Sequence, residues 1–378
     1  MRSGKRRKVT AENSDSRGGK LARKQNVVTD ADGGNSTATM EHILPILYKV
    51  GVEAGGDNSE PDRETKAKET NEYECVDIHK QPAFDNILLK NHKIQMNPSL
   101  LPKSRRNSEL SSSKESSFEQ QGKGCPSGMY AVFQTKPNTN VKYNGAKAII
   151  DLYNPAVKQN QISMAQIWIE AGPPAELNGI QVGWAVHPHL YGDNKTRVTA
   201  YWTADQSQKT GCYNSICPGF VQVHPSERLG QDFGAVSVID GQQYGTTPMI
   251  YKDPNTGNWW LVVENRISIG YWPKELFTHL NDGASFVQYG GWTYNSPDGL
   301  SPPMGSGRFA SGNLKQSCFF AQIELMNTNN NLVDATEDIL QRFVDSDKCY
   351  SAKFWGYQGS VLGQSFSFGG PGGQCNAA

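Results

Sequence analysis

The sequence predicts an all-β protein whose main domain is an antiparallel β-sandwich. Two observations favour this class. From residue 130 onward, short runs of apolar and aromatic residues are separated by Gly, Asn, Asp and Pro. Only two short segments, 273–280 and 336–344, have a helical pattern, and neither is long enough to compete with the strands. Many short strands with regular turns are typical of sandwiches and barrels.

Seven segments are the expected strands of this domain. Each is rich in β-branched or aromatic residues, and turn residues such as DPNTG at 253–257 separate them. The expected strands are 146–153, 163–169, 180–186, 197–203, 247–251, 259–264 and 267–271.

The N-terminal part has a different composition. Residues 1–70 are polar, charged and poor in aromatics, which predicts a disordered tail. The run KRRK at residues 5–8 is compatible with a nuclear address, but a solvated basic tail is the simpler interpretation. Because the whole chain has a formal net charge of +0, we expect no nucleic-acid partner.

A linker separates the two remaining parts of the chain. Residues 103–124 are rich in Ser, Lys and Glu, which predicts a solvated linker and a cleavage zone. The parts are a short segment at 71–102 and the main domain at 125–378. No run approaches the roughly 20 apolar residues of a membrane helix, so we expect no membrane partner. The basic start is not followed by an apolar core, so no signal peptide is visible.

The seven cysteines leave at least one thiol unpaired unless it pairs between molecules. Cys212 and Cys217 would close a very short loop. Cys349 and Cys375 bracket the Gly-rich last segment, where a disulfide would remove unfolded-state entropy. Zinc would need a further Cys or His pair at a usual spacing, so we expect no metal and no cofactor. Asn194 begins a glycosylation sequon, which is used only in a secreted chain.

The expected strand at 180–186 has two different faces, because successive side chains alternate. The core face carries Ile180, Val182, Trp184 and Val186. The other face carries Gln181, Gly183, Ala185 and His187. A polar residue beside small ones leaves room for a ligand, and an ordinary solvent face is the alternative interpretation.

Two motifs far apart in the chain resemble signatures of the neprosin family of plant proteins. Residues 179–188 read GIQVGWAVHP, and residues 289–292 read YGGW and are followed by PMGSG at 303–307. Residues 73–92, YECVDIHKQPAFDNILLKNH, are similar to the activation-peptide signature that precedes the main domain in this family. The resemblance covers about residues 72–378.

The resemblance implies a small pro-segment domain before an antiparallel sandwich whose concave face binds peptide. It also implies an extracellular or vacuolar protein, in agreement with the cysteines although no signal peptide is visible. Peptidase members of the family cut after proline at acidic pH with two glutamates. One acts as a base on water, and the other, protonated, polarises the scissile carbonyl.

Gln181 and Trp292 stand where the resemblance places these two glutamates. A glutamine amide donates a hydrogen bond but cannot take a proton, and an indole offers one N–H donor and no base. Loss of a general base typically lowers the rate by about 10²–10⁴-fold. We therefore expect a weakened or inactive homologue, and whether the chain is an enzyme stays open.

A carboxylate from elsewhere in the sequence is the alternative source of catalysis. Gln and Glu form a working dyad in a fungal group of glutamic peptidases, so a relocated acid beside Gln181 would restore activity. The candidates are Glu170, Glu176, Glu264 and Glu324. Glu264 is the first choice because it closes an expected strand, and an ordinary ion-paired carboxylate is the alternative interpretation.

Three functions follow from these residues. The first is binding of Pro-rich peptide without turnover in a groove with Gly183, His187 and Tyr294, because aromatic faces stack on proline rings. The second is a prolyl endopeptidase, active at acidic pH, that uses a relocated glutamate. The third is a carbohydrate-binding sandwich. The expected partner is a peptide or Pro-rich protein, and the sequence does not predict the oligomeric state.

Overall fold

The computed structural model describes residues 76–102, 128–138 and 140–375. The predictions of a disordered tail at 1–70 and a linker at 103–124 therefore lie outside the described residues. The short segment is described from residue 76 and the main domain from residue 128.

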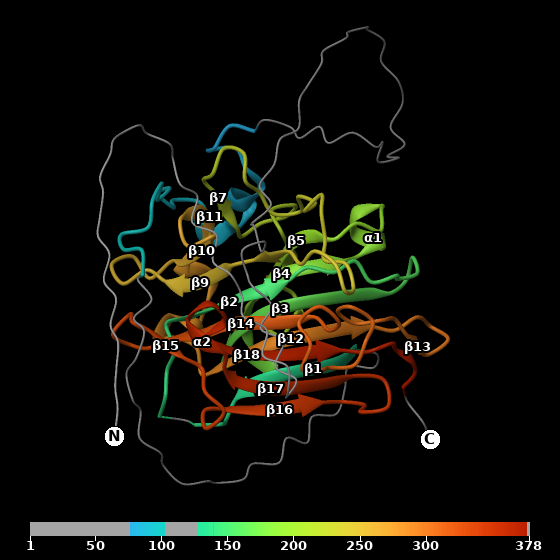
Figure 1. Ribbon diagram of the computed structural model, residues 1–378. Coiled ribbons are helices and arrows are strands. Elements are labelled where there is room, and N and C mark those ends of the chain that lie inside the picture. Colours follow the sequence, from blue (N-terminus) through green and yellow to red (C-terminus); the bar gives the residue numbers. More distant parts are fainter. Residues whose placement is uncertain (1–75, 103–127, 139, 376–378) are drawn as a thin grey trace, which may run out of the picture. The chain divides into compact units, whose positions relative to one another are not determined.

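Two antiparallel sheets contain most of the strands in the described part of the chain (Figure 1). The seven-stranded sheet has the order β16 (Leu340–Val344), β1 (Gly128–Thr135), β12 (Phe286–Tyr294), β3 (Ile162–Ala171), β4 (Asn178–Val186), β5 (Arg197–Thr203) and β6 (Cys212–Tyr213).

The ten-stranded sheet has a main path of eight strands and two short strands beside it. The path is β17 (Ser351–Tyr357), β18 (Gln364–Gly369), β14 (Phe319–Met326), β2 (Gly145–Asp151), β9 (Pro248–Lys252), β10 (Trp259–Val263), β11 (Ile267–Trp272) and β7 (Val221–Gln222). The short strands are β15 (Leu332–Asp334) on β14 and β8 (Gly245–Thr246) on β2. A separate small ladder joins β13 (Leu300–Ser301) to β19 (Gly373–Gln374).

The all-β prediction is confirmed, and each of the seven expected strands coincides with a strand of these sheets. Alternation of side chains explains why. In β3 the small and branched residues Ala165, Ile167 and Ile169 are fully buried, while the residues between them point to the opposite face. The four core residues expected in β4 are likewise at most 1% exposed.

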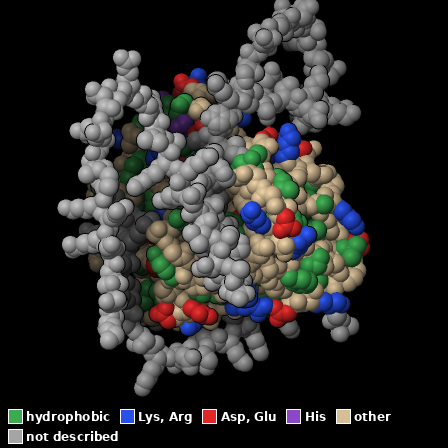
Figure 2. All heavy atoms as spheres, in the orientation of Figure 1, with side chains coloured by type: hydrophobic (Ala, Val, Ile, Leu, Met, Phe, Trp, Pro, Cys, Tyr) green, Lys and Arg blue, Asp and Glu red, His purple; other side chains and the backbone are tan. Residues whose placement is uncertain are grey.

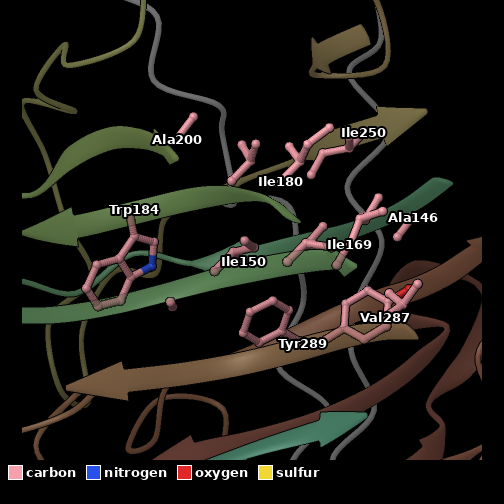
Figure 3. Close-up of a cluster of buried hydrophobic side chains, with 14 of the residues drawn as sticks. Ala146, Ile150, Ile169, Ile180, Trp184, Ala200, Ile250, Val287 and Tyr289 are labelled. Carbon is pink, nitrogen blue, oxygen red and sulfur yellow. The ribbon is translucent and has the colours of Figure 1, made fainter. Parts of the chain in front are cut away.

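The core lies between the two sheets. Figure 3 shows Ala146, Ile150 and Ile250 of the ten-stranded sheet meeting side chains of the seven-stranded sheet. The latter include Ile169, Ile180, Trp184, Ala200, Val287 and Tyr289. Burial of this apolar surface on both inner faces is the main force that holds the sandwich together.

One helical prediction is wrong. Residues 336–344 were expected to be helical, but Leu340–Val344 forms β16 and pairs with β1 at the edge of the seven-stranded sheet. Leu340 is 2% exposed in the core, so pairing and burial override the local pattern.

Around residues 273–280, two short 3₁₀ turns, η5 (Lys274–Leu276) and η6 (Leu280–Asp282), replace a continuous helix. The side-chain oxygen of Asn178 accepts the backbone N–H groups of Thr278 and His279, which interrupts helical hydrogen bonding.

The other helical elements in the described residues are short. They are α1 (Pro188–Tyr191), α2 (Gly359–Leu362), and the 3₁₀ turns η2 (Pro82–Asp85), η3 (Ile87–Leu89) and η4 (Pro174–Glu176). Within those residues no helix is long and apolar enough to cross a bilayer.

Candidate functional site

Gln181 and Trp292 lie on the same side of the seven-stranded sheet. Gln181 on β4 is opposite Trp168 on β3, and Trp168 is opposite Gln288 on β12. Gln288 and Trp292 are four residues apart on β12, so their side chains share a face. This face points away from the core. We call it the candidate face.

The two side chains are nevertheless well separated. Gln181 is level with Trp168 of β3, whereas Trp292 is level with Met164, four residues along the same strand. Two strand spacings of about 4.8 Å and four residue rises of about 3.3 Å put the two Cα atoms roughly 16 Å apart in a flat sheet. Gln181 and Trp292 therefore do not form one compact pair.

A row with little side-chain bulk separates them. Across five strands it contains Val132, Gly290, Gln166, Gly183 and Thr199, and we call it the glycine row. A Cβ atom on Gly183 would lie 2.0 Å from the Ala165 carbonyl oxygen, and one on Gly290 would lie 2.4 Å from that of Ala131. Only glycine fits at these two positions.

Trp292 leans away from the glycine row. A Cβ atom on Gly128, at the start of β1, would lie 2.1 Å from the indole nitrogen of Trp292. The ring is also 6.3 Å from the ring of Tyr130 and 6.1 Å from that of Tyr294. The indole therefore fills the space over Gly128 and supplies an apolar surface where a catalytic carboxylate is expected.

Aromatic side chains extend across the candidate face on both sides of Gln181. The ring centroid of Tyr130 is 6.2 Å from that of Trp168, and Trp168 is directly across from Gln181. On the other side, Tyr201 is directly across from Gln181 and its ring is 4.7 Å from that of Tyr213. Trp168 is only 3% exposed, so the ring surfaces available for stacking are those of the partly exposed Tyr130, Tyr201 and Tyr213.

Gln166 is the most unusual residue of this face. Its side chain is fully buried in the glycine row, and neither atom of its amide group has a hydrogen-bond partner in the described part of the protein. Leaving such a group unpaired costs about 1–3 kcal/mol. The neighbouring residue Gln181 is half-buried.

Glu170 is the one of the four candidate acids that shares this face. It is on β3, two residues from Trp168, and stands opposite Gly179 of β4. Such diagonal positions place Glu170 and Gln181 about 7–8 Å apart. A Cβ atom on Gly179 would lie 3.7 Å from Cγ of Glu170, so the side chain lies over this glycine. Burial raises the pKa of Glu170 to about 7.

The other three candidate acids lie elsewhere. Glu264, the first choice from the sequence, follows β10 in the ten-stranded sheet, where its carboxylate accepts the backbone N–H of Thr247 at 3.0 Å. The Glu324 carboxylate lies 2.9 Å from Nζ of Lys147 within that same sheet. The carboxylate of Glu176, in η4, lies 3.1 Å from Nε2 of His279. The structure brings none of these three onto the candidate face beside Gln181.

His187 and Tyr294 lie at two edges of the candidate face. His187 caps α1: its ring nitrogen Nδ1 accepts the backbone N–H of Leu190 at 3.1 Å. Burial lowers the pKa of His187 to about 4, so the ring is neutral at pH 7. Tyr294 is 42% exposed at the end of β12.

Both expected disulfides are present. Cys212 is bonded to Cys217 beside β6, and Cys349 is bonded to Cys375 at the C-terminal end of the described chain. Cys318 is buried as a free thiol. Asn194 of the sequon is exposed after α1.

Charge on the visible surface is mixed. The part of the surface in Figure 2 that is not grey carries Lys and Arg side chains interspersed with Asp and Glu. Among the residues that the structure describes, no group of three or more His, Cys, Asp or Glu side chains is arranged to hold a metal ion.

Gln166 and the packing partners of Gln181 were not predicted from the sequence. Gln166 lies within an expected strand, and its alternation with buried Ile167 places it on the outer face. That it meets Gly183 and Gly290 depends on the register of three strands, which the residue pattern of β3 does not specify.

Comparison with known proteins gives two family matches. The Neprosin family model matches residues 159–371, and the Neprosin activation peptide model matches residues 65–161. The first match contains both Gln181 and Trp292.

Solved structures with similarity to this chain include two peptidases. A scytalido-glutamic peptidase with a peptide-based transition state analog has 12% sequence identity and a TM-score of 0.36. SCP-B, a member of the Eqolisin family of peptidases in a complex with the tripeptide Ala-Ile-His, has 11% identity and a TM-score of 0.33. Each alignment covers 64% of this chain and 98% of the other chain.

Proposed function

The chain belongs to the neprosin family, and from this premise we propose that it binds an extended, proline-containing peptide on the candidate face. The observation that carries this proposal is the unpartnered, buried amide of Gln166 in a row flanked by aromatic rings. A glutamine amide has both a donor and an acceptor, as a peptide group has. Because this amide is fully buried, a bound peptide would satisfy both atoms by drawing the Gln166 side chain outward beside the flanking glycines.

The aromatic residues supply the preference for proline. Proline-rich segments adopt an extended helix that docks onto aromatic-lined surfaces with little loss of entropy. Tyr201 is partly exposed and directly across from Gln181, so a peptide that crosses β4 would contact its ring. At the family's two glutamate positions, this chain offers hydrogen-bond donors and apolar surface instead of acids, so binding at acidic pH proceeds without turnover.

Calorimetric titration of the full chain tests this proposal. The ligands are a proline-rich peptide, a peptide with alanine at every proline, and an oligosaccharide. We expect the proline-rich peptide to bind most tightly, and Tyr201→Ala to weaken its binding at least tenfold. Tyr357→Ala is the matched control, because Tyr357 is 54% exposed on β17 of the other sheet. Binding of the oligosaccharide without either peptide would contradict the proposal and favour a carbohydrate-binding sandwich.

Glu170 supports a second candidate function, hydrolysis by a relocated acid. Its ionised carboxylate would take a proton from a water molecule, whose oxygen then forms a bond to the scissile carbonyl carbon. The Gln181 amide would donate a hydrogen bond to the resulting oxyanion. Glu170 would return the proton to the leaving nitrogen as the C–N bond breaks. Because the pKa of Glu170 is about 7, this base is ionised only near or above neutral pH.

A digest of a proline-rich protein at pH 5 and pH 8 separates the two candidates. Relocated catalysis predicts slow cleavage at pH 8, less at pH 5, and at least 100-fold less after Glu170→Gln. Glu176→Gln is the matched control, since Glu176 pairs with His279 away from the candidate face. If no fragment appears at either pH while peptide binding persists, hydrolysis by Glu170 is excluded and binding alone remains.

A further inference from the structure

The segment of residues 76–102 covers an apolar surface of the ten-stranded sheet. On the side of this sheet that faces away from the core lie six residues that are at most 1% exposed: Val221, Met249, Tyr251, Trp260, Val262 and Tyr271. Ala83 belongs to the same cluster, and Phe84 and Ile94 pack against it. Surfaces of this kind are rarely left open to water in a soluble protein.

Gln95 anchors the middle of the segment through both ends of its amide. Its oxygen accepts hydrogen bonds from Asn258 at 2.8 Å, Thr256 at 2.9 Å and the Trp260 indole at 3.3 Å. Its nitrogen donates to Asp253 at 3.2 Å. Four side chains of the sheet and its turn thus form hydrogen bonds with this one residue.

Further hydrogen bonds hold the residues that follow. Asp253 accepts from both the backbone N–H and the hydroxyl of Ser99, each at 2.5 Å. The hydroxyl of Tyr251 donates to the carbonyl oxygen of Leu100 at 2.8 Å. Burial would raise the pKa of Asp253, but the hydrogen bonds from Ser99 hold this pKa below its usual value, because they favour the ionised carboxylate.

The start of the segment closes an edge of the sheet. The side-chain oxygen of Gln81 accepts the backbone N–H of Gln222 on β7 at 2.8 Å, and its nitrogen donates to the Gln222 carbonyl at 3.2 Å. This amide therefore replaces a neighbouring strand at β7. Leu89, farther along the segment, is 1% exposed and belongs to the main core of the sandwich.

The segment and the candidate face belong to different sheets. The segment lies on the outer side of the ten-stranded sheet, near β7, β10 and β11 (Figure 1), while Gln181 and Trp292 are on the outer side of the seven-stranded sheet. Every contact above is made by residues up to Leu100, before the linker begins. Cleavage in the linker would therefore break none of them.

We propose that residues 76–102 stay bound after the linker is cut and form a small, non-covalent second chain of the mature protein. Their partner is the apolar outer surface of β9, β10 and β11 together with the edge of β7. The segment then acts as a permanent cover of the second sheet. This inference does not depend on the proposed function of the candidate face.

The test introduces a site for a sequence-specific protease within residues 110–118 of the full chain. After complete cleavage at pH 7, the pieces are separated by gel filtration and identified by mass spectrometry. We expect the segment to co-elute with the main domain. Gln95→Ala should speed its loss at least tenfold, and Met96→Ala, a neighbour whose side chain is 52% exposed, should not.

Thermal unfolding of both uncleaved variants shows whether they are folded before cleavage. Prompt release of the wild-type segment in the absence of denaturant would overturn the proposal. Equal retention by Gln95→Ala and the wild type would also overturn it, since the amide network would then contribute nothing.

Discussion

Gln181 and Trp292 alter the candidate face in different ways. Gln181 keeps the size and the donor capacity of a protonated glutamate and loses only its proton chemistry. Trp292 brings a large ring that packs over Gly128 and lines the face with Tyr130 and Tyr294. Under the proposed function, Gln181 would donate a hydrogen bond to a bound carbonyl and Trp292 would offer a stacking surface, so the face would bind peptide without hydrolysis.

Restoring both acids tests whether only these two residues prevent the family's chemistry. The double change Gln181→Glu with Trp292→Glu should still give no cleavage after proline at acidic pH, because the two Cα atoms are roughly 16 Å apart in the sheet and the new carboxylates would not form the close pair that splits pKa values. The measurement is mass spectrometry of a proline-rich protein after digestion. Each single change is the control and should remain inactive. Cleavage by the double variant, but by neither single variant, would show that only these two residues prevent hydrolysis and that the two acids act together despite their separation.

Replacing Gln166 should raise the stability of the fold and lower its affinity for peptide. Gln166→Met keeps the shape and removes an unpaired buried amide, so the protein should become about 1 kcal/mol more stable, a rise of roughly 2–4 °C in Tm. Peptide binding should weaken at least tenfold.

Gln161→Met is the matched control for this change. Gln161 is 4% exposed, and its amide is hydrogen-bonded to the backbone of Lys158 and Leu300. The same substitution there should lower Tm. A fall in Tm for Gln166→Met as well would show that its amide is satisfied in solution, for example by a buried water molecule.

The raised pKa of Glu170 predicts a pH-dependent stability difference. The folded protein holds the proton up to about pH 7, whereas the unfolded chain loses it near pH 4.5. The folded state is therefore disfavoured as pH rises through this window, by at most about 3 kcal/mol. Urea unfolding should show Glu170→Gln equal to the wild type at pH 4 and more stable at pH 8. An equal difference at both pH values would contradict the raised pKa.

At the scale of the elements, the sequence predicts strands whose two faces differ in composition. β4 is such a strand, and its alternation of Ile180, Val182 and Trp184 with small or polar residues identified both faces. β16 was missed because residues 336–344 show no such alternation, and the partner that makes them a strand, β1, is about 200 residues away in sequence. Pairing with distant strands is not encoded in a local pattern.

The candidate site shows the same limit. The resemblance identified Gln181 and Trp292, and alternation assigned Gln181 to an outer face. The acid beside Gln181 is Glu170, however, and not Glu264, because the register of β3 against β4 decides which carboxylate is near. One residue of slip would move Glu170 relative to Gly179 and change its neighbours.

The disulfide between Cys349 and Cys375 belongs to this scale because it ties β17 to the C-terminal strand β19. Its sequence separation of 26 is larger than the 5 of Cys212–Cys217. Loop-closure entropy then predicts a loss of about 3–4 kcal/mol for Cys375→Ser and about 2 kcal/mol for Cys217→Ser. Calorimetry under oxidising conditions measures both, and a larger loss for Cys217→Ser would show that strain or packing decides instead.

At the scale of the whole molecule, the two outer faces of the sandwich differ in composition. The outer face of the seven-stranded sheet carries the unpaired amide of Gln166 and several aromatic rings, and we propose that it binds a ligand reversibly. The outer face of the ten-stranded sheet carries a continuous apolar surface whose hydrogen bonds are already made by residues 76–102. Because the two faces belong to different sheets, residues 76–102 can cover one without blocking the other.

Retention of the segment should weaken as the pH falls, because two titrating groups at its interface both favour the unprotonated form. Burial lowers the pKa of His92, against the opposing effect of Glu275, and its ring nitrogen Nε2 is 2.9 Å from the Tyr271 hydroxyl. A group with a lowered pKa excludes its proton in the bound state, so His92 disfavours binding as the pH falls below about 6.5. Binding of the segment should weaken a second time near pH 4, because protonation of Asp253 removes an acceptor for the hydrogen bonds from Ser99.

The half-life of segment loss from the cleaved protein, measured between pH 3.5 and 8, checks this prediction. The half-life should be longest above pH 7, fall from about pH 6.5, and fall again near pH 4. His92→Gln should remove the first fall, because its amide can still reach Tyr271 but does not titrate. Asp253→Asn should shorten the half-life at every pH, since an amide cannot accept both hydrogen bonds from Ser99 as strongly as a carboxylate does. Retention that increases toward acidic pH would show that these two groups do not control the interface, and that the cover is held by apolar packing on Trp260 and Tyr251 alone.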